Sequence, residues 1–148
     1  MARYLFGANA LIDMCFAGTA VSKWIATVKP NELRMSVISV ATAREVMTRQ
    51  ARNQAELGRL KQVLAVRLAA LTNEGALILP FTDLEALEWQ VWRSHTPLDI
   101  DINGQTVPVW QDTRMVIATA FANGLELAEP AEAYHNELRS NGLTVRSI

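Results

Sequence analysis

Two patterns of apolar residues alternate along the chain: short continuous runs, and residues spaced three and four positions apart. Short runs rich in branched residues predict buried strands, at 3–8, 33–39, 76–80, 125–128 and 143–148. Apolar residues three and four positions apart predict the helices between them, at 9–16, 19–28, 41–72, 82–94, 112–122 and 131–139. This alternation predicts a single α/β domain over residues 1–148, with a central, mostly parallel sheet of four to five strands between two helical layers.

Two segments depart from simple alternation. The long helical stretch 41–72 carries a leucine stripe over 57–71, but the polar run 52–54 indicates a bend or a hairpin of two helices. Segment 98–110 contains Asn103-Gly104 between two alternating stretches, a pattern typical of a tight β-hairpin. We therefore expect a hairpin in addition to the main sheet.

Composition fits a soluble globular domain, since half of the 148 residues are apolar and a fifth are charged. The lone Cys15 cannot form an internal disulfide, so we expect a cytoplasmic protein. No uncharged apolar run approaches the roughly 18 residues of a membrane span. The net charge of −1 predicts no general attraction to nucleic acid, although residues 41–72 hold six basic and only two acidic side chains.

Carboxylates stand near the ends of several predicted strands. In open parallel sheets, functional groups gather where the strands end. Glu45 follows the second strand, Asp112 begins a later helix and Glu129 follows the fourth strand, whereas the first strand ends at Gly7 without a carboxylate. Clustered carboxylates favour hard divalent cations such as Mg²⁺ or Mn²⁺, which prefer oxygen ligands and can activate water for attack on a phosphate.

The N-terminal run 3–13 resembles the opening of the PIN-domain nucleases, which include the VapC-type toxins. That family has roughly L-L-D-x-N-x-L-I-D here, and Asn9, Leu11, Ile12 and Asp13 fit, but Gly7 holds the place of the aspartate. The aspartate is a metal ligand in the family. The resemblance therefore implies a nuclease whose metal site has one vacated ligand position.

The resemblance extends over most of the chain. Run 39–45 fits the family pattern S-V-x-x-x-x-E and implies a metal-binding role for Glu45. Run 112–120 fits D-x-x-I-A-A-T-A, although Asp112 lies one residue further from the conserved threonine than expected and Thr113 occupies the expected slot. The last family acid has no clean match; Glu129 is the nearest candidate and Glu132 the next.

These matches imply a metal-dependent endoribonuclease toxin. Glu45, Asp112 and Asn9 would form the catalytic set, and Glu45, Asp112 and Glu129 would hold Mg²⁺ or Mn²⁺ beside the vacated position at Gly7. The expected partners are a cognate antitoxin, an RNA substrate and a second copy of the chain. Each residue also has an ordinary structural alternative: Asn9 or Asp112 could cap a helix, and Glu45 could pair with Arg49.

Gly7 predicts greatly reduced or absent activity. Two explanations of the glycine compete. The protein could be a toxic nuclease that was inactivated so that it could be expressed, or a natural protein whose site has degenerated. The good fit of Asn9, Asp13 and Glu45 to the family pattern favours the first explanation. The alternative function is a catalytically dead PIN-fold module that binds RNA or protein. Arg44, Arg49 and Trp110 are the candidate RNA contacts, although the arginines could equally form a solvated helix face.

Overall fold

A computed structural model describes residues 3–148, apart from the side chains of Asp99 and Asp101. The strands are β1 (Tyr4–Phe6), β2 (Leu33–Ser36), β3 (Leu77–Leu79), β4 (Asp99–Ile102), β5 (Gln105–Pro108), β6 (Glu126–Glu129) and β7 (Val145–Ser147). The helices are α1 (Ala8–Met14), α2 (Ala20–Ile25), the short 3₁₀ helix η1 (Pro30–Glu32), α3 (Val37–Gln50), α4 (Gln54–Asn73), α5 (Asp83–Trp92), α6 (Gln111–Ala122) and α7 (His135–Ser140).

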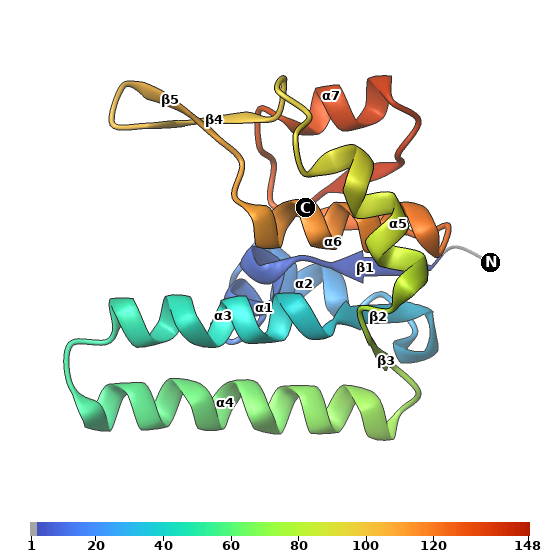
Figure 1. The fold of residues 1–148 in the computed structure, drawn as a ribbon. Coiled ribbons are helices and arrows are strands. Elements are labelled where there is room, and N and C mark those ends of the chain that lie inside the picture. The colour runs from blue at the N-terminus through green and yellow to red at the C-terminus, as the bar shows by residue number, and fades with distance from the viewer. Residues whose placement is uncertain (1–2) are drawn as a thin grey trace.

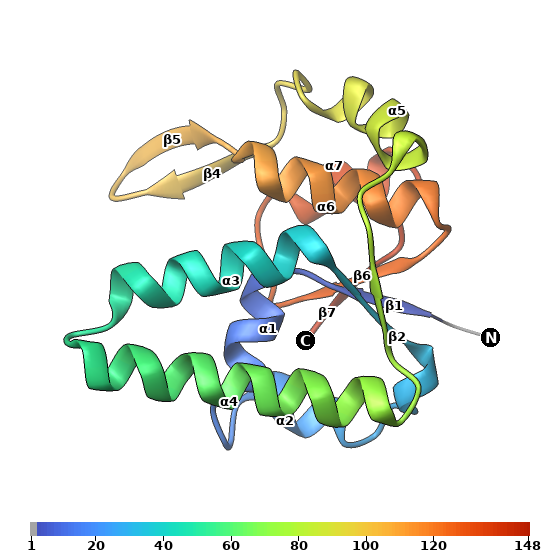
Figure 2. The ribbon, with the colours of Figure 1, turned by 60° about the horizontal axis from the view of Figure 1, so that its bottom comes forward.

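A five-stranded, all-parallel sheet forms the centre of the fold, in the order β3-β2-β1-β6-β7. Helices α1 to α4 cover one face and α5 to α7 cover the other (Figures 1 and 2). Neighbouring residues of β1 point to opposite faces, so that Phe6 packs in the core under α1 to α4 and Leu5 in the core under α5 to α7. The predicted three-layer α/β fold is confirmed.

The start of the third helix differs from the prediction. We expected strand 33–39 and a helix from residue 41, but β2 ends at Ser36 and α3 begins at Val37. The Ser36 hydroxyl accepts a hydrogen bond from the backbone N–H of Ile38, at 3.1 Å, and so caps the helix. The branched residues after Ser36 suit a strand as well as a helix, which is why the boundary was misplaced. The earlier start of α3 changes which of its residues face the functional site described below.

The long stretch 41–72 is a hairpin of two helices rather than one helix. Helices α3 and α4 lie side by side, joined through Ala51–Asn53 (Figures 1 and 2). The side chain of Asn53 accepts a hydrogen bond from the backbone N–H of Glu56 at 2.8 Å and starts the second helix. None of the described helices is long and apolar enough to cross a membrane.

The predicted β-hairpin is present as β4 and β5, which pair antiparallel and extend away from the central sheet (Figure 1). Its turn residues Asn103 and Gly104 have φ of 51° and 79°, the left-handed backbone that this dipeptide favours. The base of the hairpin is fixed by Arg114 of α6, whose buried guanidinium donates hydrogen bonds to the carbonyls of Val109 and Leu98. The hairpin is thereby held beside the carboxyl ends of the central strands.

Candidate functional site

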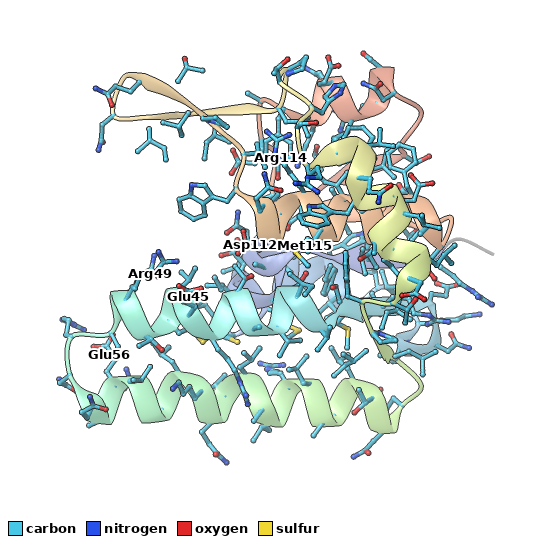
Figure 3. All side chains as sticks on the ribbon, viewed as in Figure 1. Glu45, Arg49, Glu56, Asp112, Arg114 and Met115 are labelled. Carbon is cyan, nitrogen blue, oxygen red and sulfur yellow. The ribbon has the colours of Figure 1, made fainter. Side chains whose placement is uncertain are left out.

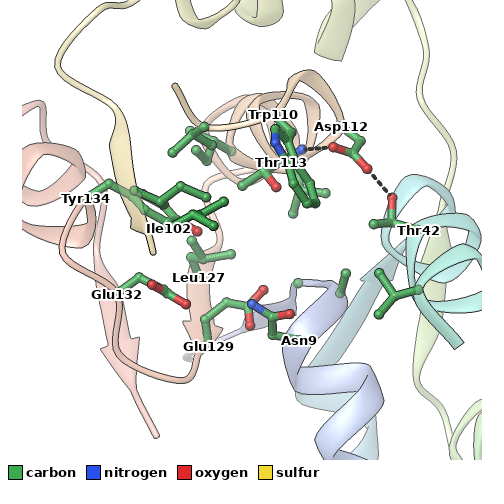
Figure 4. A pocket seen from close by; sticks show the side chains of 17 residues that line it. Asn9, Thr42, Ile102, Trp110, Asp112, Thr113, Leu127, Glu129, Glu132 and Tyr134 are labelled. Carbon is green, nitrogen blue, oxygen red and sulfur yellow. Dashed lines mark hydrogen bonds between the residues drawn. The ribbon is translucent and has the colours of Figure 1, made fainter. Parts of the chain in front are cut away.

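One pocket of about 290 Å³ lies where β1 and β6 end, beside the first turns of α1 and α6 and the base of the hairpin (Figure 4). Its polar lining comes from Asn9, Thr42, Asp112, Thr113, Glu129, Glu132 and Tyr134. Its apolar lining includes Ile100 and Ile102 of the hairpin and Leu127 of the sheet. The pocket is therefore partly apolar, and its polar groups come from segments far apart in the sequence.

The structure brings several predicted site residues to this pocket. Gly7, Asn9, Asp112 and Glu129 all line it, and so does Trp110. Asn9 does not cap α1, because the helix starts at Ala8 and Gly7 is its N-cap residue. We expected the candidate site residues to gather where the strands end, and those named above do so. Glu45 is the exception.

Glu45 does not line the pocket. It lies on the exposed surface of α3, and Thr42, one turn earlier on the helix, takes the place facing the pocket (Figures 3 and 4). Because α3 starts at Val37, residue 45 stands more than two turns from the sheet edge, whereas residue 42 stands closer to it. The match of Glu45 to the family glutamate was counted from Ser39, which we expected at the end of a strand. The structure ends that strand at Ser36 and places Ser39 inside α3.

Asp112 uses both of its carboxylate oxygens within the protein. One oxygen accepts a hydrogen bond from the Thr42 hydroxyl at 2.8 Å, and the other accepts from the backbone N–H of Thr113 at 3.0 Å (Figure 4). The first contact links α6 to α3, and the second satisfies a free N–H in the first turn of α6. Asp112 is therefore a pocket side chain in the first turn of α6. It is not the N-cap residue that its structural alternative proposed, because Trp110 holds that place.

Glu129 is a buried carboxyl, with only 7% of its surface exposed. One of its oxygens accepts a hydrogen bond from the backbone N–H of Ala10 at 3.0 Å. Burial raises the pKa of Glu129 to about 8, an effect that the Ala10 N–H opposes and the nearby Glu132 and Asp13 carboxylates reinforce. The neutral carboxylic acid is thus the main form of this side chain at neutral pH.

The side chain of Glu129 also fills the space beside Gly7. A Cβ atom built on Gly7 would lie 1.4 Å from Oε1 of Glu129 and 2.4 Å from its Cδ. The space that a side chain at position 7 would enter, where the resemblance led us to expect an aspartate, is therefore occupied by a carboxyl group from another strand. Sequence inspection did not find this, because the two residues are distant in the chain.

The residues present do not fit a divalent metal ion. Within the part of the chain that the structure describes, no three His, Cys, Asp or Glu side chains gather in a way that could hold one. Asp112 lies with Thr42 on one side of the pocket and Glu129 with Asn9 on another (Figure 4). The expected cluster of Glu45, Asp112 and Glu129 is not assembled, since Glu45 lies outside the pocket and the two other carboxyls line different sides of it.

A basic and aromatic rim borders the pocket. Trp110 lines it with half of its surface exposed, and the guanidinium of Arg49 lies 5.8 Å from the centre of the indole ring. Arg44 is exposed on the same helix as Arg49 but does not line the pocket. Sequence reasoning missed Thr42 and Tyr134; the serine cap at Ser36 is the local feature that would have placed Thr42.

The sequence matches no protein-family model and no curated protein. The fold does match solved structures over nearly their whole length. VapBC2 from Rickettsia felis, bound to a DNA fragment from its promoter, has a TM-score of 0.72 at 12% identity, covering 98% of both chains. VapC20 from Mycobacterium tuberculosis, a sarcin-ricin loop cleaving toxin, has a TM-score of 0.64 at 13% identity, covering 95% of this chain and 96% of that one.

A third similar structure is VapBC-5 from Mycobacterium tuberculosis, a member of the VapBC family of toxin–antitoxin systems. It has a TM-score of 0.61 at 15% identity and covers 100% of this chain and 98% of that one. These identities are low, so the likeness concerns the arrangement of helices and strands. The chain has the PIN-like fold of the VapC-type toxins.

Proposed function

We propose that this chain is a PIN-fold protein of the toxin–antitoxin type that binds a partner protein and has little or no metal-dependent endoribonuclease activity. The observation that carries the proposal is the Glu129 carboxyl, which occupies the space beside Gly7 where the family has a metal-binding aspartate. The fold, shared with VapC-type toxins, supports an antitoxin as the partner. The catalytically dead module is thus favoured over the active nuclease.

Among the described residues no three metal-ligating side chains gather, so the pocket lacks the group that would supply metal-assisted catalysis. A bound divalent ion would lower the pKa of a water molecule and stabilise the charge that develops on a phosphate. Here both Asp112 oxygens accept hydrogen bonds from protein groups, and the main form of Glu129 at neutral pH is uncharged. To hold an ion, Glu129 would have to lose its proton, and Asp112 would have to share its oxygens with the donors that they already accept from.

An RNA substrate or ligand remains part of the proposal at the rim of the pocket. Arg49 and Trp110 form a cation–aromatic pair there, and such pairs bind phosphates and stack bases in many single-strand binding sites. Arg44 adds a second exposed positive charge on α3. The same exposed rim is also suited to contact with the partner protein. Metal binding and RNA cleavage are therefore the two properties that test the proposal.

The first prediction concerns metal and RNA cleavage. We expect no shift in the melting temperature of the purified protein on addition of millimolar Mn²⁺ or Mg²⁺, and no RNA cleavage above an EDTA-treated sample. Cleavage that depends on Mn²⁺ and is lost in Asp112→Asn would contradict the proposal. Glu45→Gln is the matched control, because Glu45 lies outside the pocket and its loss should leave any pocket-based activity unchanged.

A second copy of the chain is also proposed as a partner, through α5. Leu84, Leu87 and Val91 form an exposed apolar stripe on this helix, with 54%, 64% and 62% of their surfaces exposed. Leu77 and Ile78 of the edge strand β3, which precedes α5, are also exposed. A two-fold interface over α5 would bury this stripe against itself.

Disruption of this stripe is the second prediction. Leu87→Glu is expected to yield a monomer where the unmodified chain is a dimer, because the substitution places a charge in an apolar contact. Light scattering coupled to size-exclusion chromatography measures the mass. Val66→Glu on α4 is the control, since Val66 is 56% exposed and receives the same charge. A dimer that persists in Leu87→Glu would rule out this interface.

A further inference from the structure

We propose that the pocket is held together by two direct side-chain contacts in place of a metal ion, and that Gly7 is required because its missing side chain makes room for one of them. The contacts are Glu129 with Ala10, and Thr42 with Asp112. The inference concerns how the pocket is built, and it goes beyond the proposed function, which concerns what the protein binds.

The backbone does not explain the glycine at position 7. Its φ of −83° and ψ of −179° lie in the extended region that any residue adopts. Other glycines of the chain, such as Gly75 and Gly104, have positive φ and are favoured for that reason. The requirement at Gly7 must therefore come from the space around it.

That space is filled by Glu129. The nearest atoms to an added Cβ are Oε1, Cδ and Cγ of Glu129, at 1.4, 2.4 and 3.1 Å. Even alanine at position 7 would displace the carboxyl group and break its 3.0 Å hydrogen bond to the Ala10 N–H. A buried N–H without an acceptor is destabilising, so the glycine and the glutamate form a matched pair.

The first contact joins β6 to α1, across 119 positions of sequence. The second joins α3 to α6, across 70 positions, through the Thr42 hydroxyl and the Asp112 carboxylate. Together the two contacts connect α1, α3, α6 and β6 around the pocket (Figure 4). A metal ion with ligands from several elements would connect them in the same way.

The matched pair bears on what an aspartate at position 7 would do. The Glu129 carboxyl occupies the space beside Gly7 and hydrogen-bonds to the neighbouring helix. Gly7→Asp by itself would therefore bring two carboxyl groups into the space of one.

A double-mutant cycle tests the pair through thermal unfolding of the full chain. Gly7→Ala is expected to lower the melting temperature by about 5 °C, because Glu129 must leave and Ala10 loses its acceptor. In the Glu129→Ala background the same Gly7→Ala change should cause no further loss, since the space is then free. Gly58→Ala is the control: nothing lies within 4 Å of its added Cβ, and it lies inside α4, where alanine is favoured.

Two results would overturn the inference. One is an equal effect of Gly7→Ala with and without the Glu129 side chain, which would show that the two positions are independent. The other is a double variant that fails to fold when Glu129→Ala alone folds, because the freed space should accept the alanine. Stabilisation of the unmodified chain by Mn²⁺ would contradict the proposed function and also the statement that these contacts replace a metal ion, whereas the cycle reports on the Gly7–Glu129 pair alone.

Discussion

Replacement of Arg114 by methionine is expected to destabilise the protein by about 3 kcal/mol or more. Only 3% of Arg114 is exposed, and its guanidinium donates to the backbone carbonyls of Val109, Trp92, His95 and Leu98. Methionine has a similar volume but no donor, so all four carbonyls would lose the guanidinium, although those of Leu98 and Trp92 would each keep a backbone N–H. The affected segment joins α5 to the hairpin, which forms one wall of the pocket (Figure 3).

Urea unfolding measures the loss of stability, and limited proteolysis shows whether residues 93–110 loosen first. Arg114→Lys separates charge from geometry: lysine keeps the positive charge, but its single ammonium cannot reproduce the spread of the guanidinium donors, and we expect it to recover only part of the stability. Arg59→Met is the control, since Arg59 is exposed on α4. If Arg114→Met and the unmodified chain were equally stable, the hydrogen bonds of Arg114 would make no net contribution to the free energy of unfolding.

Stability is expected to fall by about 2 kcal/mol between pH 6.5 and pH 8 because of Glu129. Its pKa is raised from 4.5 to about 8 by burial, so the folded protein holds a proton that the unfolded chain releases. The unfolded state binds fewer protons in this range, and the free energy of unfolding therefore decreases as the pH rises. At pH 8 about half of the folded molecules still hold this proton, so the decrease levels off only above that pH, once both states are ionised.

His135 sets the lower limit of this window. Burial lowers its pKa from 6.5 to about 4, with a smaller contribution from Arg139, so below pH 6.5 the unfolded state takes up a proton that the folded state does not. Stability gained by His135 as the pH rises to 6.5 opposes the loss from Glu129. Above pH 6.5 His135 no longer contributes a pH dependence, and Glu129 still does. The decline in the free energy of unfolding is therefore expected in that range.

Urea unfolding at a series of pH values tests this, with Glu129→Gln as the informative variant. Glutamine keeps the shape and an oxygen acceptor for the Ala10 N–H but does not ionise, so the decline should disappear. Glu132, Asp13 and Tyr134 face or influence the same carboxyl and remain in place. Glu45→Gln is the control, and a decline that persists unchanged in Glu129→Gln would assign the effect to another group.

Much of the fold follows from local patterns. Alternating apolar runs and stripes predicted the order of strands and helices, because burial of one face imposes a fixed spacing on each element. Asn103-Gly104 predicted the hairpin, because both residues tolerate positive φ. The boundary at Ser36 was misplaced, since the branched residues that follow suit a strand or a helix, and the misplaced boundary directed attention to Glu45 instead of Thr42.

The sequence by itself determined the layered α/β arrangement, the hairpin turn and a first strand that ends at Gly7 without a carboxylate, all of which are properties of neighbouring residues. Only the tertiary structure decided that Glu129 fills the space beside Gly7, that Thr42 meets Asp112, and that Arg114 is buried among carbonyls. These contacts join residues far apart in the chain. Their partners depend on how the layers pack, and no local spacing records which side chains the packing will bring within reach.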